Sequence, residues 1–326
     1  MMLVLVIPHE WGHLIVAKKC GVKVNEFSVG MGPLLFKTQR GETQYSFRLL
    51  PLGGYCAMEG EEEASDDPRS YYAKSNGQKV AILLAGVTMN VIIAIVVMSV
   101  MVALTGVPTT KIETVTSGYP AEAAGIETGD KLLEINGNKI SYWEDVSELV
   151  GEYTEGDKME LTIKRDGEEL TVLLTPQWNE EEQRYMIGIV PSSSRNPLLC
   201  LRYGAISTWN MNVMLVDAFR SMFTQGIDKD DVSGPVGLVQ AVDKTNDYGA
   251  EYYLMLLALV SLNLAIFNLL PIPGLDGGKI FFIILKVISG GRINDDMEYK
   301  ATVAGMILLL SVFVLVTVND VSNLFG

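Results

Sequence analysis

Three long apolar stretches limit the fold of this chain more than any other feature of its sequence. They cover residues 80–105, 253–273 and 301–318. One helix needs about 20 apolar residues to span the hydrocarbon core of a bilayer, and each stretch approaches or exceeds that length. We therefore predict a polytopic α-helical membrane protein.

A fourth stretch, residues 1–17, is apolar but carries two histidines, a glutamate and a proline. Ionisable side chains inside a membrane-spanning segment usually serve a function, so an intramembrane site explains this stretch better than a plain anchor does. A secretory signal peptide is the alternative. However, the stretch lacks a basic n-region and a small-residue cleavage site, and Lys18 and Lys19 follow the apolar run instead of preceding it. With this stretch included, we expect about four transmembrane helices.

Both histidines of the chain lie in the five-residue run from His9 to His13, which has the sequence HEWGH. This is the HExxH pattern. Residues four apart share one face of a helix, so both imidazoles can bind one zinc ion while Glu10, beside the metal, acts as general base. The pattern also arises by chance, but its position in an apolar helix and its use of every histidine argue against coincidence.

A catalytic zinc ion takes three protein ligands and keeps one position for water, so a third ligand is needed. Asp276 stands out among the acidic residues near the apolar stretches, within the run Asn268–Gly278. Two prolines and three glycines break the helix in this run. Non-helical backbone at membrane depth is tolerated where it is packed in protein or lines a wet cavity. Asp276 is therefore the candidate third ligand, and a simple helix end with an exposed aspartate is the alternative.

These features together resemble a bacterial site-2 protease of the regulator of sigma-E protease type, an intramembrane zinc metalloprotease. The resemblance covers nearly the full length of the chain. The matching elements, in chain order, are the HExxH run, a predicted turn at Gly30–Pro33, Tyr45–Tyr55, Ala85 and Gly86 with Asn90, and Asn268–Gly278. The ordered set is far more specific than any one of its members.

The resemblance implies a role for each candidate site residue. It implies that His9, His13 and Asp276 bind one zinc ion per chain and that Glu10 activates the attacking water. It also implies that Asn268 holds the substrate or the developing oxyanion.

Residues 45–58 match a membrane-associated β-loop of the same family. The resemblance implies that this loop pairs with an extended substrate, which agrees with the physics of strand addition. The candidate substrate-binding residues in the loop are Tyr45, Phe47, Leu49, Gly53 and Gly54. A helical substrate hides its carbonyl groups in hydrogen bonds, so we expect it to unwind onto this loop before cleavage.

The chain departs from the family at its start. Family members usually have more apolar residues before HExxH, whereas only eight residues precede His9 here. Seventeen helical residues reach about 26 Å, which is less than a hydrocarbon core about 30 Å thick. We therefore expect the N-terminus to be truncated or its start misassigned.

Residues 106–190 are expected to form an independent soluble domain. Alternating residues on either side of Asp166-Gly167 predict a β-hairpin over Lys158–Leu174. Ser117–Ala121, Ala124–Ile126 and Gly129–Gly137 resemble a PDZ domain. We expect one PDZ domain in this region, and a generic small β-rich domain is the alternative.

The predicted organisation has four parts. Residues 1–105 form an N-terminal membrane core with the HExxH helix, a β-loop region and the second span, and residues 106–190 form the PDZ domain. Residues 191–252 form an amphipathic connecting segment with a helix over 198–224. Residues 253–326 form a C-terminal membrane core with the third zinc ligand. Within the β-loop region, Phe27–Pro33 and Tyr45–Met58 are expected to be short strands.

Basic residues predict the orientation in the membrane. They gather between the first two predicted spans, at Lys18, Lys19, Lys23, Lys37, Arg40, Arg48, Arg69, Lys74 and Lys79. Segments rich in lysine and arginine stay in the cytoplasm, so residues 60–75 and 288–298 are expected inside and residues 106–250 outside. We expect a multi-pass protein of the bacterial inner membrane, with an extracytoplasmic PDZ domain and an active site towards the cytoplasmic side.

The net charge of -14 argues against a nucleic-acid partner, because phosphate binding needs basic patches. The resemblance implies cleavage of single-pass membrane proteins in regulated intramembrane proteolysis. Expected substrates are anti-sigma factors already cut by an upstream site-1 protease, or remnant signal peptides. A catalytically silent membrane scaffold that binds proteins through its PDZ domain is the alternative. A CAAX-type membrane metalloprotease is a weaker one, because such enzymes have no PDZ insertion and no equivalent of Asn268–Gly278.

Overall fold

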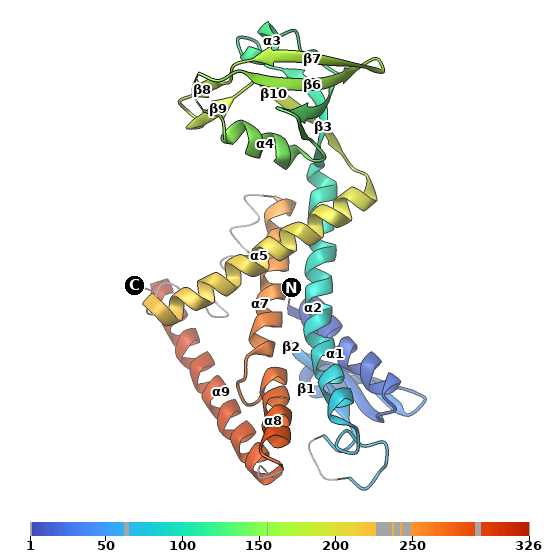
Figure 1. The fold of residues 1–326 in the computed structure, drawn as a ribbon. Coiled ribbons are helices and arrows are strands. Elements are labelled where there is room, and N and C mark those ends of the chain that lie inside the picture. Colours follow the sequence, from blue (N-terminus) through green and yellow to red (C-terminus); the bar gives the residue numbers. More distant parts are fainter. Residues whose placement is uncertain are drawn as a thin grey trace. The chain divides into compact units, whose positions relative to one another are not determined.

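The computed structural model describes residues 2–61, 65–154, 156–225, 249–290 and 295–325, together with Gly237 and Val242. The chain divides into two compact units (Figure 1), which are Met1–Met101 with Gly204–Gly326 and the inserted segment Val102–Tyr203. The inserted unit extends beyond the predicted limits 106–190 at both ends. Most of 226–248 in the predicted connecting segment, and 291–294 in a predicted cytoplasmic segment, lie outside the described residues.

Helices dominate the first unit, although α2 and α5 each continue into the second. They are α1 (Met2–Lys19), α2 (Asn76–Thr105), α5 (Pro197–Gln225), α7 (Ala250–Leu269), α8 (Asp276–Ile288) and α9 (Asp295–Phe325). Among the described helices, three are long and apolar enough to cross a membrane, judged by length and composition: α2, α7 and the Met297–Val318 part of α9. These three match the apolar stretches of the sequence. Helix α1 is not one of them, since it carries Glu10 and two lysines, so the fourth crossing stays a prediction.

Small side chains allow α2, α7 and α5 to pack closely. Ala94 and Met98 of α2 form a buried cluster with Ala258 and Leu262 of α7. Helix α5, which corresponds to the helix predicted over 198–224, crosses α2 at Gly204. A Cβ atom at Gly204 would lie 2.3 Å from the Oγ of Ser99. Close approach through small residues is how helices associate where lipid supplies no hydrophobic driving force.

Two long strands, β1 (Val24–Arg40) and β2 (Thr43–Met58), form a sheet beside α1. The first half of β1 pairs with 54–58 on one side and with 44–47 on the other. The second half of β1, from Leu34 onward, pairs with 43–48. Four extended segments therefore lie side by side, and segment 54–58 is at one edge.

The prediction of short strands at Phe27–Pro33 and Tyr45–Met58 was too short for the first of them. Gly30 and Gly32 were interpreted as part of a turn, but β1 continues through both, with φ angles of +85° and +78°. Glycine adopts such angles without steric cost, so the strand bends and changes partner instead of ending. At Gly30 a Cβ atom would also lie 2.7 Å from the backbone oxygen of Leu50.

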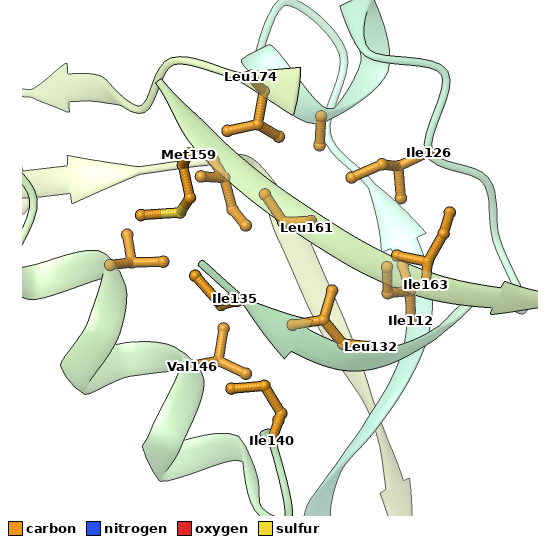
Figure 2. Close-up of a cluster of buried hydrophobic side chains, with 13 residues drawn as sticks. Ile112, Ile126, Leu132, Ile135, Ile140, Val146, Met159, Leu161, Ile163 and Leu174 are labelled. Atoms are coloured by element: carbon orange, nitrogen blue, oxygen red, sulfur yellow. The ribbon is translucent and has the colours of Figure 1, made fainter. Parts of the chain in front are cut away.

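In its described residues, the inserted unit has a main sheet, a two-stranded sheet of β8 and β9, two helices and a core of its own. Its elements are β3 (Val107–Val115), α3 (Pro120–Ala123), β4 (Lys131–Ile135), β5 (Asn138–Lys139), α4 (Trp143–Gly151), β6 (Met159–Arg165), β7 (Glu168–Leu174), β8 (Gln177–Asn179), β9 (Arg184–Met186) and β10 (Ile189–Ser194). The main sheet has the order β10-β3-β4-β6-β7, with β5 paired to β4. Strands β6 and β7 form the predicted hairpin. Figure 2 shows Leu132, Ile135, Leu161 and Ile163 in one buried cluster that also contains Val146 of α4.

Candidate metal centre

The predicted metal ligands come from two helices at opposite ends of the chain. His9 and His13 lie one turn apart on α1 and are both buried. Asp276 is the first residue of α8. Helix α7 ends at Leu269 and α8 begins at Asp276, so the helix is broken in the run where prolines and glycines predicted a break.

Two glycines allow α8 to begin where it does. A Cβ atom at Gly277 would lie 2.3 Å from the backbone oxygen of Leu269, and one at Gly278 would lie 2.2 Å from that of Ile272. Any side chain at either position would push the start of α8 away from the preceding turn. The two glycines after Asp276 therefore fix where its carboxylate lies.

The three predicted ligand atoms form a nearly equilateral triangle. The Nε2 atoms of His9 and His13 are 3.2 Å apart, and each lies 3.3 Å from Oδ2 of Asp276. Ligands bound tetrahedrally at 2.0–2.1 Å from a zinc ion are about 3.3–3.4 Å from one another. The triangle therefore has the dimensions of one face of a zinc coordination tetrahedron.

The carboxylate of Asp276 is also short of a partner. Its Oδ2 atom is buried and makes no hydrogen bond to any residue that the structure describes, although both imidazoles are close. A buried carboxylate oxygen without a partner is costly, and a cation facing it would remove that cost. Within the described part of the chain, these three residues form the group of histidine and carboxylate side chains that could hold a metal ion. The residues present therefore fit zinc.

One face of α2 holds the two imidazole rings through residues spaced four apart. Nδ1 of His13 donates to the backbone oxygen of Ile82 at 2.8 Å, and Nδ1 of His9 lies 3.2 Å from Nδ2 of Asn90. Between them, a Cβ atom at Gly86 would lie 2.5 Å from Nε2 of His13. Gly86 and Asn90 were part of the sequence resemblance but had no assigned role, and the structure places both against the histidines.

A cavity of about 780 Å³ opens beside the triangle. Its lining includes the three predicted ligands, Glu10, Asn268 and the segment Tyr55–Glu61. Glu10 therefore reaches the same space as the metal group without being part of it. A general base next to a metal-bound water needs this placement.

Three other charged side chains that line the cavity, those of Glu59, Glu61 and Lys279, have ionic partners. Lys279 Nζ contacts Glu61 Oε1 at 2.6 Å, which joins α8 to the end of the β-loop region. Hydrogen bonds from Ser65, Asn25 and Lys23 lower the pKa of Glu59 to about 2. Glu59 therefore stays ionised at neutral pH and holds the chain beyond β2 in place.

The candidate substrate-binding residues are distributed unevenly. Asn268 lines the cavity, whereas Tyr45, Phe47, Leu49, Gly53 and Gly54 are not among its lining residues. Phe47 and Leu49 are exposed, and Tyr45 packs against Phe27. Gly54 comes nearest, since a Cβ atom there would lie 3.7 Å from Cγ of Glu10.

Sequence reasoning did not single out the part of β2 that does line the cavity, Tyr55–Met58. These residues lie within the predicted 45–58 loop. Their position at the edge of the sheet depends on pairing with the first half of β1, which local sequence pattern does not reveal.

The inserted unit has an apolar groove of its own, about 280 Å³ in volume. It lies between α4, which contributes Val146 and Val150, and the chain from Arg184 to Pro191. A helix beside a strand offers both an apolar pocket and a strand edge, the combination used to bind extended peptides.

Comparison with known proteins agrees with the chemistry of the site. The sequence matches a family model described as peptidase family M50 over residues 1–312. A protein of Clostridium acetobutylicum named "Putative zinc metalloprotease" is 35% identical over 320 residues, which cover 98% of this chain and 94% of that protein. A Clostridium perfringens protein of the same designation is 37% identical over 320 residues, which cover 97% and 95%.

Among solved structures, the PDZ domain of an SdrC-like protein from Listeria innocua matches 26% of this chain and 96% of that domain, with a TM-score of 0.24 and 17% sequence identity.

Proposed function

The chain belongs to peptidase family M50, and from that premise we propose that it cuts single-pass membrane proteins within or beside the bilayer. The family and its relatives make the protein a zinc metallopeptidase. The observation that carries the finer proposal is the triangle of His9, His13 and Asp276 beside the apolar helix α2.

His9, His13 and Asp276 are the residues that would hold one zinc ion. When bound, zinc polarises the scissile carbonyl and lowers the pKa of a water molecule from about 15.7 towards about 7. Helix α1 supplies two ligands on one face, and the start of α8 supplies the third.

Glu10 acts as the proton carrier of the reaction. Its carboxylate lines the cavity next to the ligand triangle, so it can take a proton from the attacking water and pass it to the leaving amine. Asn268, at the end of α7, lines the same cavity and can donate a hydrogen bond from its amide to the carbonyl oxygen of the substrate.

An extended substrate is held along the edge of β2. Segment 54–58 pairs with β1 on one side, and in the described part of the chain no strand pairs with its other side. Tyr55–Met58 also lines the cavity, so a substrate strand added at this edge would run past Glu10. Strand addition would keep an unwound substrate from refolding into a helix during cleavage.

The proposed substrate class and cellular setting rest on the resemblance to site-2 proteases. Single-pass membrane proteins shortened by an upstream site-1 protease, such as anti-sigma factors, and remnant signal peptides are the proposed substrates. The protein would lie in the bacterial inner membrane, with the inserted unit as an extracytoplasmic PDZ domain that selects and does not catalyse.

Zinc analysis and peptide cleavage on the purified protein test the enzymatic proposal. We expect about one zinc ion per chain and cleavage of a model transmembrane peptide, lost with a chelator and restored by zinc. Bound zinc without cleavage of any transmembrane peptide would favour the silent scaffold.

Cysteine labelling in intact cells tests the proposed orientation of the protein in the membrane. Starting from a chain whose three cysteines are replaced, a cysteine at exposed Ser75 should resist impermeant reagents in intact cells, and one at exposed Gln177 should react. The opposite pattern would refute the proposed topology.

A further inference from the structure

Asn90 is a fully buried polar residue in the middle of the apolar helix α2. Its side-chain amide faces Nδ1 of His9 at 3.2 Å. The Oδ1 atom at the other end of the amide is buried and has no hydrogen-bond partner in the described part of the chain. Burying an amide in an apolar helix is costly unless its hydrogen bonds are made. There must therefore be a structural or functional reason for an asparagine at this position.

Helix packing does not supply that reason. Helix α7 is attached to this point of α2 through Ser261, whose Oγ donates to the backbone oxygen of Asn90 at 2.8 Å. A backbone oxygen is present whatever the side chain, so this link would survive with an apolar residue at position 90. The amide itself contacts His9.

The two histidines differ in what their Nδ1 atoms meet. His13 faces the backbone oxygen of Ile82, which can only accept, so its Nδ1 carries the hydrogen and its Nε2 is free for a metal. His9 also presents Nε2 to the ligand triangle and needs the same tautomer. Its Nδ1 must then donate, and the group facing it must be an acceptor.

Asn90 can be that acceptor. The oxygen and nitrogen of an amide have nearly the same shape, and a half-turn of the group exchanges them. In either orientation only one end of the Asn90 amide meets His9, so the tautomer of His9 decides which end it is. Binding of a metal at Nε2 selects the orientation with Oδ1 towards Nδ1–H.

We infer that Asn90 is a positioning residue for His9. In the zinc-loaded protein, its Oδ1 accepts a hydrogen bond from Nδ1–H of His9 and holds the tautomer and ring orientation that leave Nε2 free for the metal. This inference rests on the proposed function, since it requires zinc to be bound by His9, His13 and Asp276.

Zinc affinity of the full-length protein in detergent tests the inference. Asn90→Leu has a similar size but offers no acceptor, so its dissociation constant for zinc, measured by chelator competition, should rise about 10–100-fold. Asn90→Asp keeps an acceptor and should stay within a few-fold of the parent. Thr88→Val on the same helix is the control, because among the described residues the Thr88 hydroxyl bonds to its own helix, at the backbone oxygen of Leu84. It should leave zinc affinity unchanged.

Equal zinc affinity in Asn90→Leu and the parent would overturn the inference, and so would an equal loss in Asn90→Leu and Asn90→Asp. Two other results would refute the proposed function itself. They are a parent protein that binds no zinc, and a His13→Ala variant that binds zinc as tightly as the parent.

A second measurement needs no variant at position 90. The chain has two histidines, so ¹⁵N-labelled histidine gives few imidazole signals. In the zinc-loaded parent, both rings should show a protonated Nδ1 and a metal-bound Nε2. A metal-bound Nδ1 in the His9 ring would overturn the inference.

Discussion

Oδ2 of Asp276 lies 3.3 Å from Nε2 of His13, although the two residues stand at opposite ends of the chain. Only the fold brings them together, by placing the start of α8, after the break that follows α7, next to α1. The metal centre therefore depends on folding as well as on the HExxH run, and metal content reports on both.

Asp276→Ala should lose both zinc and activity. A missing ligand should weaken zinc binding by more than the roughly 10–100-fold expected when an outer hydrogen-bond partner is removed. Zinc content of the purified variant, measured by atomic emission, checks this. Glu59→Gln removes a cavity carboxylate outside the ligand group and should keep zinc. Full zinc content in Asp276→Ala would mean that the third ligand lies elsewhere.

Gly86→Ala should abolish zinc binding without removing any ligand. The added Cβ atom would lie 2.5 Å from Nε2 of His13, so α2 and the imidazoles cannot keep their present positions. Gly77→Ala on the same helix is the matched control, since no atom of the described residues lies within 4 Å of a Cβ atom there. Zinc titration of both variants makes the comparison. Normal zinc affinity in Gly86→Ala would refute the close packing of α2 on the two rings.

Glu10→Gln should keep zinc and lose cleavage. The side chain lines the cavity but is not one of the three candidate ligands, so only proton transfer is affected. A missing general base usually costs about 10²–10⁴-fold in rate. Parallel zinc analysis and peptide cleavage assays separate the two effects. A variant that loses its zinc would show that Glu10 helps to bind the metal.

Local sequence pattern was sufficient to predict the candidate zinc ligands and the helix break next to one of them. Spacing placed His9 and His13 on one helix face, and the prolines and glycines around Asp276 predicted the break between α7 and α8. These features need only a few neighbouring residues, so they can be recognised without knowing the fold.

Contacts across the fold were not predictable in the same way. The role of Gly86 depends on α1 lying against one face of α2, and the cavity wall at Tyr55–Met58 depends on β1 changing partner at its glycines. Glycines in a strand pattern can mean a turn or a bend, and the choice is made by distant partners. Phe47 and Leu49, which were predicted to bind substrate from the middle of the β-loop, therefore do not line the cavity in the structure.

The inserted unit should lose stability in acid through Asp130. Arg165 donates two hydrogen bonds to this buried carboxylate, at 2.8 and 2.7 Å, and holds the pKa of Asp130 below its usual value. A carboxylate with a lowered pKa stabilises the fold fully above its unfolded-state pKa, and that stability is lost as the pH falls through its folded-state pKa. We expect the melting temperature of isolated residues 102–203 to fall below about pH 4.

Substitution at this pair tests the cause of the acid sensitivity. Asp130→Asn should cost about 1–3 kcal/mol at neutral pH and reduce the further loss in acid. Glu127→Gln removes the exposed partner of the same arginine and should cost less than about 1 kcal/mol. If Asp130→Asn melted like the parent at every pH, the pair would not be the source of the acid sensitivity.

The inserted unit is expected to select substrates and to leave zinc binding to the rest of the chain. Its sequence contains no histidine, and the candidate ligands all lie in the first unit. Pro108 of β3 and Ser193 of β10 are paired neighbours, so residues 109–192 can be removed and the ends joined by a short flexible linker. The shortened protein should bind zinc with unchanged stoichiometry, because no ligand is lost.

Cleavage by the shortened protein then shows what the unit selects. If it excludes substrates with bulky external domains, the shortened protein should cut a trimmed single-pass substrate at about the parent rate and an intact one faster than the parent does. Both substrates are compared at matched protein levels, with Glu10→Gln as the inactive control. Unchanged discrimination would refute selection by size. Loss of all cleavage with zinc retained would instead mean that the unit presents substrates, since β2, Glu10 and the ligand triangle all remain in the shortened chain.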